Sequence, residues 1–276
     1  KKDVSDGVTA RNLKDLQKEY TTGTPQYQFL RQYLTISRAE IFFAEKAVLI
    51  EGDTERILIP TIMKKVDIEE GVGHKTAGTT DTCLPLLSQN ISIVEVGAYS
   101  QIFEKFIDFL GIKSLVITDL DAVDENGLAC KVADGVSYSN NAIDFFFGSP
   151  TLDHLKTRTI SDKQFNKVAG AWSRQVNGKV CVVYQVEENG DNARSFEDGF
   201  IHLNRAFVTA NKDGFQGLKN RDDFDDATKD AYYLAGSCIK KKTHFALDIL
   251  FYSNENLDNW LIPSYIREGL LWLKKD

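Results

Sequence analysis

Short apolar runs bounded by polar residues recur along this chain and predict the strands of a buried sheet. Aliphatic and β-branched runs of this length are typical of parallel strands that are covered on both faces. The predicted strands span residues 46–50, 91–96, 114–118 and 180–186. Apolar side chains recur at helical spacing over residues 101–110, between two of these strands. This strand–helix–strand order predicts an α/β fold with a mostly parallel sheet.

The remaining segments carry weaker patterns. Asp53 or Thr54 is expected to cap a helix over residues 55–65, in which Pro60 is awkward outside the first turn. The mixed polar sequence with turn signals over residues 122–178 predicts an insertion with turns and short helices. The charge-dense sequence over residues 211–230 predicts an exposed helix. Other helices are expected over 1–44 (with Leu30, Tyr33 and Leu34 at helical spacing), 191–205 after a loop, 240–250 and 263–275.

Acidic side chains follow two of the predicted strands. Glu51 and Glu55 come after the first strand, one helical turn apart, and Asp119 and Asp121 come after the third, facing the same way. In open α/β sheets the carboxyl ends of the strands are where ligands bind. Four carboxylates gathered there repel one another unless hard divalent cations neutralise them. The pattern therefore predicts a Mg²⁺-type site that acts on phosphate, with solvated strand-end acids as the plainer alternative.

Composition restricts the interpretation. The chain has 276 residues, 42% of them hydrophobic, and a net charge of −7, so a sizeable core is expected and a passive nucleic-acid binder is not indicated. An enzyme whose metal ions supply local positive charge can still act on DNA. The four cysteines lack CxxC spacing and predict reduced thiols in a cytoplasmic protein. Neither a membrane span nor a signal peptide is indicated, so no membrane partner is expected.

Several motifs together resemble one family. Glu51-Gly52 followed by Asp119-x-Asp121 resembles the TOPRIM domain of topoisomerases, primases and a set of nucleases. The sharper resemblance is to the C-terminal TOPRIM region of the overcoming lysogenization defect (OLD) family of ATP-dependent nucleases, which includes class 2, Gabija-type antiphage nucleases. It covers roughly residues 30–275 and is carried by residues 48–55, 94–97, 118–121, 193–197, 242–246 and 262–270.

The resemblance implies a fold and a division of the chain. The expected fold is a TOPRIM-type, Rossmann-like, mostly parallel sheet flanked by helices, with a helical insertion and closing subdomain. We expect a helical lead-in segment over residues 1–44 and the TOPRIM catalytic domain over 45–210, with its insertion at about 122–178. A helical C-terminal segment over 211–276 is expected to carry the catalytic lysine.

The resemblance also implies two-metal cleavage of DNA by an endonuclease that uses Mg²⁺ or Mn²⁺. Lys242 is expected to stabilise charge on the phosphate, and this choice among Lys240–Lys242 rests on the match at 245–246, with a solvated helix start as the alternative. Arg194 and Lys241 are expected to contact DNA, although Arg194 has Glu187 and Glu188 as alternative partners. The expected metal ligands are Glu51, Glu55, Asp119, Asp121, Ser195 and Glu197.

The rest of such a nuclease is expected to lie elsewhere. Members of the OLD family carry an N-terminal ABC-type ATPase, but this chain has no GxxxxGK[ST] motif, and residues 71–76 only echo one. We therefore expect ATP to act only through an ATPase domain that precedes Lys1 in the full-length protein. A homo-oligomer and a helicase partner are further expectations. Ser139-Asn140 also resembles a step in the family, and a turn explains it equally well.

Two other functions compete with the nuclease. The run that ends in Asp119 also fits the haloacid-dehalogenase phosphatase pattern, with Asp119 as nucleophile, Asp121 as general acid and residues 222–226 as the late acidic motif. That hypothesis leaves residues 51–55 unexplained. The other alternative is a non-catalytic assembly domain with a dimer face formed by the aromatic residues Trp260, Tyr265 and Trp272.

Overall fold

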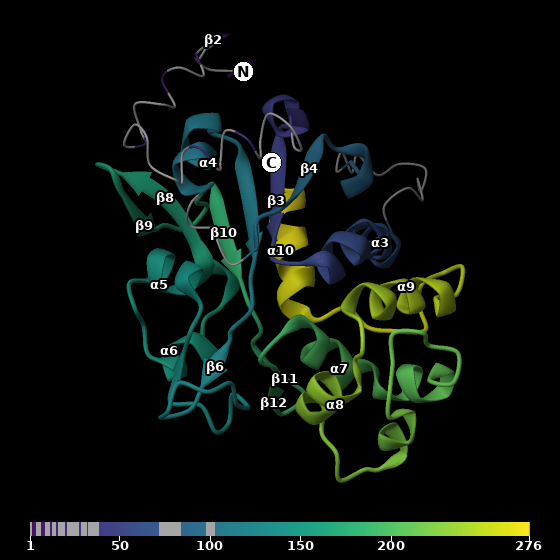
Figure 1. Ribbon diagram of the computed structural model, residues 1–276. Helices are drawn as coiled ribbons and strands as arrows, with labels where there is room; N and C mark the ends of the chain where they lie inside the picture. Colours follow the sequence, from purple (N-terminus) through teal and green to yellow (C-terminus); the bar gives the residue numbers. More distant parts are fainter. Residues whose placement is uncertain are drawn as a thin grey trace.

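The computed structural model describes residues 39–71, 84–97 and 103–275, together with a few short stretches of the first 38 residues. Its centre is a six-stranded sheet (Figure 1). The strand order is β4 (Ile91–Glu95), β3 (Lys46–Ile50), β5 (Lys113–Ile117), β10 (Val180–Val183), β8 (Gln164–Val168) and β9 (Ala171–Arg174). The first four strands are parallel, and β8 and β9 join them antiparallel. The expected mostly parallel α/β sheet is confirmed.

Helices cover both faces of the sheet, which explains why the strand sequences are almost continuously apolar. Alternate side chains of β3 enter different cores: Val48 and Ile50 pack on one face, and Ala47 and Leu49 on the other. The first face is covered by α3 (Asp53–Glu69), α7 (Phe196–Asn211), α8 (Ala231–Cys238), α9 (Lys242–Tyr252) and α10 (Ser264–Lys274). The second face is covered by η1 (Ala39–Phe43), α4 (Glu104–Leu110) and α5 (Asn141–Phe147).

Helix α10 lies directly on the sheet because one residue in it has no side chain. A Cβ atom at Gly269 would lie only 2.8 Å from Leu115 Cδ1 and 3.2 Å from Val183 Cγ2. The last carbonyls of the helix lack helical partners and are satisfied by lysines from the strands. Lys113 Nζ donates to Trp272 O at 2.7 Å, and Lys46 Nζ donates to the carbonyl of residue 274 at 3.3 Å.

The segment between β5 and β10 differs from the prediction. It contains turns and short helices, as expected, but it also contributes β8 and β9, which extend the central sheet. Its other elements are β6 (Ala122–Val123), β7 (Ser137–Tyr138), α5, α6 (Leu152–Lys156) and η4 (Ile160–Lys163). The polar residues that β8 places between its apolar ones weaken the strand pattern, because this strand lies near the sheet edge.

The predicted helix over residues 211–230 is wrong. Only a short 3₁₀ helix, η5 (Arg221–Asp225), forms there among turns, and the unpredicted α8 follows it. Asp226 Oδ1 accepts from the Thr228 N–H at 3.0 Å, and Asp230 caps α8 by accepting from the Tyr233 N–H at 2.8 Å. Short acidic side chains compete in this way with helical hydrogen bonds and favour turns and helix starts.

Two local predictions also fail. Helix α3 begins at Asp53 with Gly52 as its N-cap, so neither Asp53 nor Thr54 caps it, and Pro60 lies inside the helix beyond the first turn. The expected aromatic dimer face does not exist, because Trp260, Tyr265 and Trp272 are buried in the protein's own core.

The remaining short elements lie at the start of the chain and in the connections between the main helices and strands. Leu30, Tyr33 and Leu34, which were expected in a helix, lie outside the described residues. The first residues contain two short strands, and a small hairpin precedes α7. These elements are β1 (Lys2–Asp3), β2 (Gly7–Val8), η2 (Leu86–Ser88), β11 (Glu187–Glu188) and β12 (Asp191–Asn192). None of the helices among the described residues combines the length and the apolar character that a membrane crossing requires.

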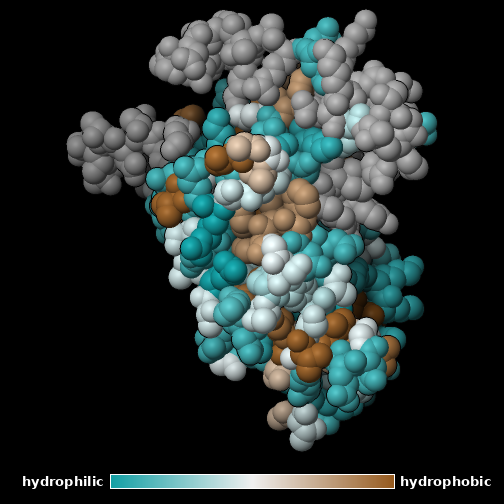
Figure 2. Space-filling model, turned by 90° about the vertical axis from the view of Figure 1, so that its left-hand side faces the viewer, coloured by the Kyte–Doolittle hydropathy of each residue, from teal (hydrophilic) through white to brown (hydrophobic). Residues whose placement is uncertain are grey.

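The outer surface beside β8, β9 and α5 is mixed in character. Figure 2 looks onto this side and shows apolar patches separated by hydrophilic atoms. Phe145 and Val168, from α5 and β8, are exposed apolar residues of this part of the chain. Scattered exposure of this kind is ordinary for a folded domain.

A buried ion pair that joins α3 to α10 generates a stability prediction. Lys274 Nζ lies 2.8 Å from Asp67 Oδ1, and Asp67 Oδ2 accepts from the Leu86 N–H at 2.7 Å. Lys274→Met leaves the Asp67 charge buried without its cation, so we expect a loss of about 3 kcal/mol in unfolding free energy, measured with urea. Adding Asp67→Asn should recover part of the loss. The control Arg267→Met breaks an exposed pair with Glu69 and should cost less than about 1 kcal/mol.

Candidate metal and active site

Four predicted acids meet where β3 and β5 end and where α3 and α7 begin. Glu51 follows β3 directly, and Glu55 lies in the first turn of α3. Asp119 follows β5 by two residues, and Glu197 lies in the first turn of α7. The side chains of Glu55 and Glu197 are almost completely buried, and the charges of all four act on one another. The topology therefore brings together acids that lie up to 146 residues apart (197 − 51).

Glu51 is held by two buried side chains. Thr118 Oγ1 donates to Glu51 Oε1, and Asn140 Nδ2 donates to the same oxygen at 2.9 Å. Asn140 Nδ2 also lies 2.9 Å from the carbonyl oxygen of Asp119. The other half of the amide, Asn140 Oδ1, accepts from the N–H groups of Ala142 and Ile143 and so caps α5. A local turn or cap therefore accounts for the oxygen of the Asn140 side chain but not for its nitrogen, which holds Glu51.

Asp119 is held by a second buried amide and by a helix start. Gln185 Nε2 donates to Asp119 Oδ1 at 2.6 Å, and the Phe196 N–H in the first turn of α7 donates to the same oxygen at 3.0 Å. The positive end of the α7 dipole thus faces this carboxylate. Gln185 also accepts from the Leu120 N–H and donates to the Tyr265 hydroxyl at 3.1 Å.

Glu197 lies between α3 and α9. Thr54 Oγ1 donates to Glu197 Oε1 at 2.8 Å, and Lys242 Nζ donates to Glu197 Oε2 at 2.9 Å. Lys242 is the first residue of α9 and is 65% exposed, whereas Lys241 is the exposed residue before the helix. Ser195 is the N-cap of α7, where its hydroxyl accepts from the Asp198 N–H at 3.4 Å. Thus Lys242 is the lysine of 240–242 that contacts a site carboxylate among the described residues.

Asp121 and Arg194 form an ion pair at the rim of this group. Arg194 Nη2 lies 2.8 Å from Asp121 Oδ1, and Arg194 Nε donates to Ala122 O at 3.1 Å. The alternative pairing of Arg194 with Glu187 or Glu188 is therefore wrong. Asp121 has φ of 52°, a left-handed conformation in which Asp and Asn are over-represented.

These acids are poorly compensated. Burial raises the pKa of Glu55 to about 7, and the Glu197 charge adds to this shift. Burial raises the pKa of Asp119 well above its usual range, with a further contribution from the Glu55 charge, and burial also raises the pKa of Glu51. Crowded oxygen donors of this kind are the chemistry that hard divalent cations bind.

The acids do not form a complete set of metal ligands in this structure. Within the described ranges, no three acidic, histidine or cysteine side chains converge closely enough to form a ready-made metal site. Lys242 Nζ instead supplies positive charge beside Glu197, and Arg194 supplies it beside Asp121. The donor chemistry fits divalent cations, and Lys242 and Arg194 are the groups whose ion pairs their entry would weaken.

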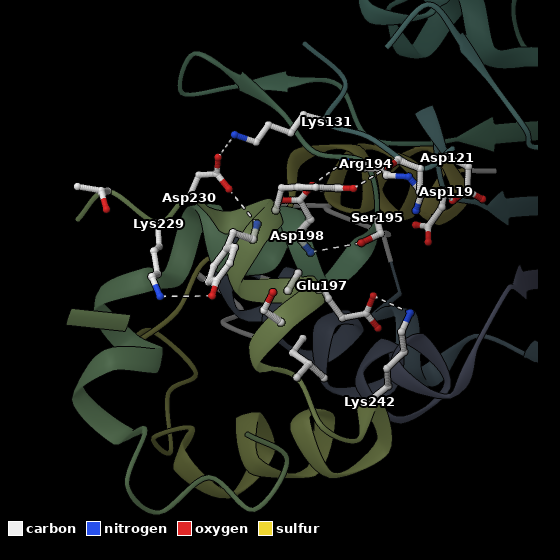
Figure 3. A pocket seen from close by; sticks show the side chains of 18 residues that line it. Asp119, Asp121, Lys131, Arg194, Ser195, Glu197, Asp198, Lys229, Asp230 and Lys242 are labelled. Carbon is white, nitrogen blue, oxygen red and sulfur yellow. Dashed lines mark hydrogen bonds and ion pairs between the residues drawn. The ribbon is translucent and has the colours of Figure 1, made fainter. Parts of the chain in front are cut away.

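A cleft of about 770 Å³ opens beside the acids and runs along α8 (Figure 3). Asp119, Asp121, Glu197 and Lys242 line one end of it. Figure 3 shows the ion pair between Lys131 and Asp230 on its opposite side. Of the described residues that line the cleft, none belongs to the acidic run 222–226, whose members Asp223 and Asp225 pair with Lys229 and Lys212. The phosphatase alternative therefore lacks its late acidic motif.

The comparison with known families agrees with the residues at this site. Residues 42–121 match the family model described as overcoming lysogenization defect protein-like, TOPRIM domain. This part of the chain is similar to an OLD-like TOPRIM domain. The matched range contains Glu51, Glu55, Asp119 and Asp121, whereas Glu197 and Lys242 lie beyond it. The expected resemblance to the OLD family is confirmed.

Known proteins resemble most of the chain. The chain is 24% identical over 264 residues to the endonuclease GajA of Bacillus cereus (strain HuB5-5). The aligned region covers 90% of this chain but only 34% of GajA. The chain thus spans about a third of that relative. Two solved structures are the C-terminal regions of OLD proteins from Burkholderia pseudomallei and Xanthomonas campestris pv. campestris. They match with TM-scores of 0.45 and 0.47, identities of 20% and 17%, and coverage of 84% and 85% of this chain and 98% and 94% of theirs.

Sequence reasoning missed the polar residues that hold the acids. Thr54 and Thr118 lie inside the motifs at 48–55 and 118–121 but were not expected to contact the acids, and Gln185 belongs to no motif. Their proximity to the acidic motifs was a usable signal for Thr54 and Thr118. Gln185 lies 66 residues from Asp119, and nothing in the local pattern connects them.

The raised pKa of Glu55 predicts a pH-dependent stability. The folded protein keeps this proton up to about pH 7, and the unfolded chain releases it near pH 4.5, so stability falls as pH rises across that window. Glu55→Gln removes this penalty. We expect it to raise the unfolding free energy in EDTA at pH 8 by on the order of 1–3 kcal/mol, and by much less at pH 5.

Urea unfolding at the two pH values measures this effect. Glu70→Gln, at the exposed far end of the same helix, controls for the loss of an acidic charge. An equal gain for Glu55→Gln at both pH values would contradict the proposed coupling between burial and protonation.

Proposed function

We propose that this chain is the nuclease portion of an OLD-family protein and hydrolyses phosphodiester bonds of DNA with two divalent cations, Mg²⁺ or Mn²⁺. The observation that carries the proposal is the group of buried, mutually repelling carboxylates where β3 and β5 end, with a lysine beside it and an open cleft in front. The match to the OLD-like TOPRIM domain and the name of the GajA relative support this activity.

Different elements of the fold supply the side chains that would bind the cations. Glu51, Glu55, Asp119 and Asp121 would hold the cations from β3, α3 and the segment after β5. Glu197 and Ser195 would complete the set from the start of α7. Bound cations of this kind polarise a phosphoryl oxygen and lower the pKa of a water molecule, and two of them stabilise the attacking and leaving oxygens of a displacement.

Lys242 fits the role of a cation that stabilises charge on the reacting phosphate. Burial lowers the pKa of its ammonium group, but the charge and hydrogen bond of Glu197 together with the charges of Asp119 and Glu55 outweigh this effect and raise the pKa above its ordinary value overall. The side chain is therefore protonated at neutral pH. It is also 65% exposed and lines the cleft, so a phosphate can reach it without a rearrangement of the core.

Positive groups around the cleft support a nucleic-acid substrate. Arg194 lines the cleft next to Asp121, and cations that bind Asp121 would free its guanidinium for a phosphate. Lys241 lies exposed before α9, and we expect it to contact the DNA backbone outside the cleft. Backbone contacts of this kind position DNA without reading its sequence.

The wider activity belongs to a longer protein. Because the chain corresponds to about a third of GajA, we propose that an N-terminal ABC-type ATPase precedes it and that ATP acts only through that domain. A role in phage defence or DNA processing, a homo-oligomer and a helicase partner are parts of the same proposal.

The first functional prediction concerns the two lead carboxylates. Glu51→Gln and Asp119→Asn remove ligand charge without a change of shape, so we expect plasmid nicking in Mg²⁺ or Mn²⁺ to fall at least about 100-fold. EDTA should abolish nicking by the unaltered chain. Circular dichroism and thermal unfolding check that both variants fold.

The same samples separate the competing functions. Nicking by Asp119→Asn at the rate of the unaltered chain would contradict the proposed mechanism. Release of phosphate from p-nitrophenyl phosphate without DNA cleavage would favour the phosphatase. If neither activity appears, the assay is repeated with the full-length protein, where continued absence of both would favour an assembly domain.

The second functional prediction separates neighbouring lysines. Lys242→Met should reduce nicking at least about 100-fold at saturating metal, because the charge beside the reacting phosphate is lost. Lys241→Met is the matched control and should weaken DNA binding modestly, with a rate at saturating DNA close to that of the unaltered chain. Rates at saturating DNA measure the difference, and a larger loss for Lys241→Met would reverse the two assignments.

A further inference from the structure

We propose that Asn140 and Gln185 are positioning residues that turn one particular oxygen of Glu51 and one of Asp119 toward the cations. This inference rests on the proposed function, because it concerns how the same carboxylates are presented. Both amides are almost completely buried, and each comes from a segment far along the chain from the acid that it holds.

The two oxygens of Glu51 have different surroundings. Oε1 accepts hydrogen bonds from both Thr118 Oγ1 and Asn140 Nδ2. A carboxylate oxygen offers two lone-pair directions, so two donors use the capacity of Oε1. The Asp119 N–H also donates to this carboxylate, but no side chain among the described residues donates to Oε2, and we expect this oxygen to meet a cation.

Asp119 repeats this arrangement with different partners. Its Oδ1 accepts from Gln185 Nε2 at 2.6 Å and from the Phe196 N–H at 3.0 Å. Its Oδ2 again has no donor among the residues that the structure describes. Each lead carboxylate therefore has one oxygen fixed by protein donors and one oxygen available, which predicts binding of the cation through Oε2 of Glu51 and Oδ2 of Asp119.

Glu197 provides an independent instance of the same geometry. Thr54 Oγ1 donates to Oε1, and the only partner recorded for Oε2 within the described ranges is the ammonium group of Lys242. A positive charge thus already lies at the oxygen that Thr54 leaves open. This supports the view that the second oxygens are the ones that meet cations.

The two ends of each amide have separate tasks. Asn140 Oδ1 caps α5, and Gln185 Oε1 accepts from the Leu120 N–H, so the oxygens satisfy the backbone. The nitrogens Asn140 Nδ2 and Gln185 Nε2 hold the carboxylates. Replacing each amide by the carboxyl group of the same shape therefore keeps the oxygen that accepts from the backbone. It exchanges for a carboxyl oxygen the nitrogen that donates to the acid and, in addition, to the Asp119 carbonyl in the case of Asn140 or to the Tyr265 hydroxyl in the case of Gln185.

Groups that hold metal ligands affect metal affinity strongly. Their loss typically weakens binding 10- to 100-fold, because a ligand that is free to rotate must be ordered when the metal enters. For Gln185→Glu and Asn140→Asp we therefore expect the Mn²⁺ dissociation constant of this chain to rise about 10- to 100-fold. Electron paramagnetic resonance of free Mn²⁺ measures binding without reference to cleavage.

A matched control exists on the neighbouring strand. Gln164 in β8 is also buried, accepts from the Asn177 N–H at 2.9 Å and donates to Ile160 O at 3.2 Å, so its amide satisfies backbone groups at both ends. Gln164→Glu introduces the same chemical change away from the acids. It should lower thermal stability in EDTA as much as the other two substitutions do and leave Mn²⁺ affinity unchanged.

Each outcome decides the inference. Weaker Mn²⁺ binding by Gln185→Glu and Asn140→Asp, with stability in EDTA no lower than that of Gln164→Glu, supports positioning. Unchanged affinity overturns it and leaves the amides with a structural role, and tighter binding overturns it by making the new carboxyl group a ligand. If the unaltered chain binds no Mn²⁺, the proposed metal-dependent function fails and this inference fails with it.

Discussion

Electrostatic repulsion among buried carboxylates is the constraint on which the rest of this structure depends. The parallel strands β3 and β5 end side by side, so the acids that follow them are brought together whatever their separation in sequence. The fold holds them in that position with donors that it would not otherwise need: the amides of Asn140 and Gln185, the hydroxyl of Thr54, and the first turn of α7. The structure thus maintains a concentration of negative charge that simple stability disfavours, as is common at functional sites.

Helix α3 connects this charged site to the far side of the molecule. Its first turn contributes Glu55 and Thr54, and its last turns contribute Asp67, which is paired with Lys274 of α10. Helix α10 lies against β5 and β10 at Gly269. Through its ion pair with Asp67 it fixes the last turns of α3 relative to the sheet, and β3, which precedes α3, fixes the first turn. A rigid support of this kind is what a site needs when its ligands must be held in place against their mutual repulsion.

The sequence predicted what local patterns encode and missed what chain topology creates. Apolar runs revealed β3, β4, β5 and β10 because strands buried on both faces are apolar throughout, and the acids after β3 and β5 followed from strand ends. Asn140 and Gln185 were not predicted as partners of the acids because they lie 89 and 66 residues away from them. The charged segment 211–230 was misassigned since Asp side chains there form turns, which charge density alone does not reveal.

The left-handed backbone at Asp121 has a consequence for how this site can change in evolution. Glycine, asparagine and aspartate adopt that conformation more readily than most other residues, and the codons of the other two differ from those of aspartate by a single base. A lineage that no longer needs the carboxylate can therefore lose it in one step without disturbing the turn. Glutamate would preserve the charge but strain the backbone, so the acceptable neighbours of this residue are set by conformation and not by chemical similarity.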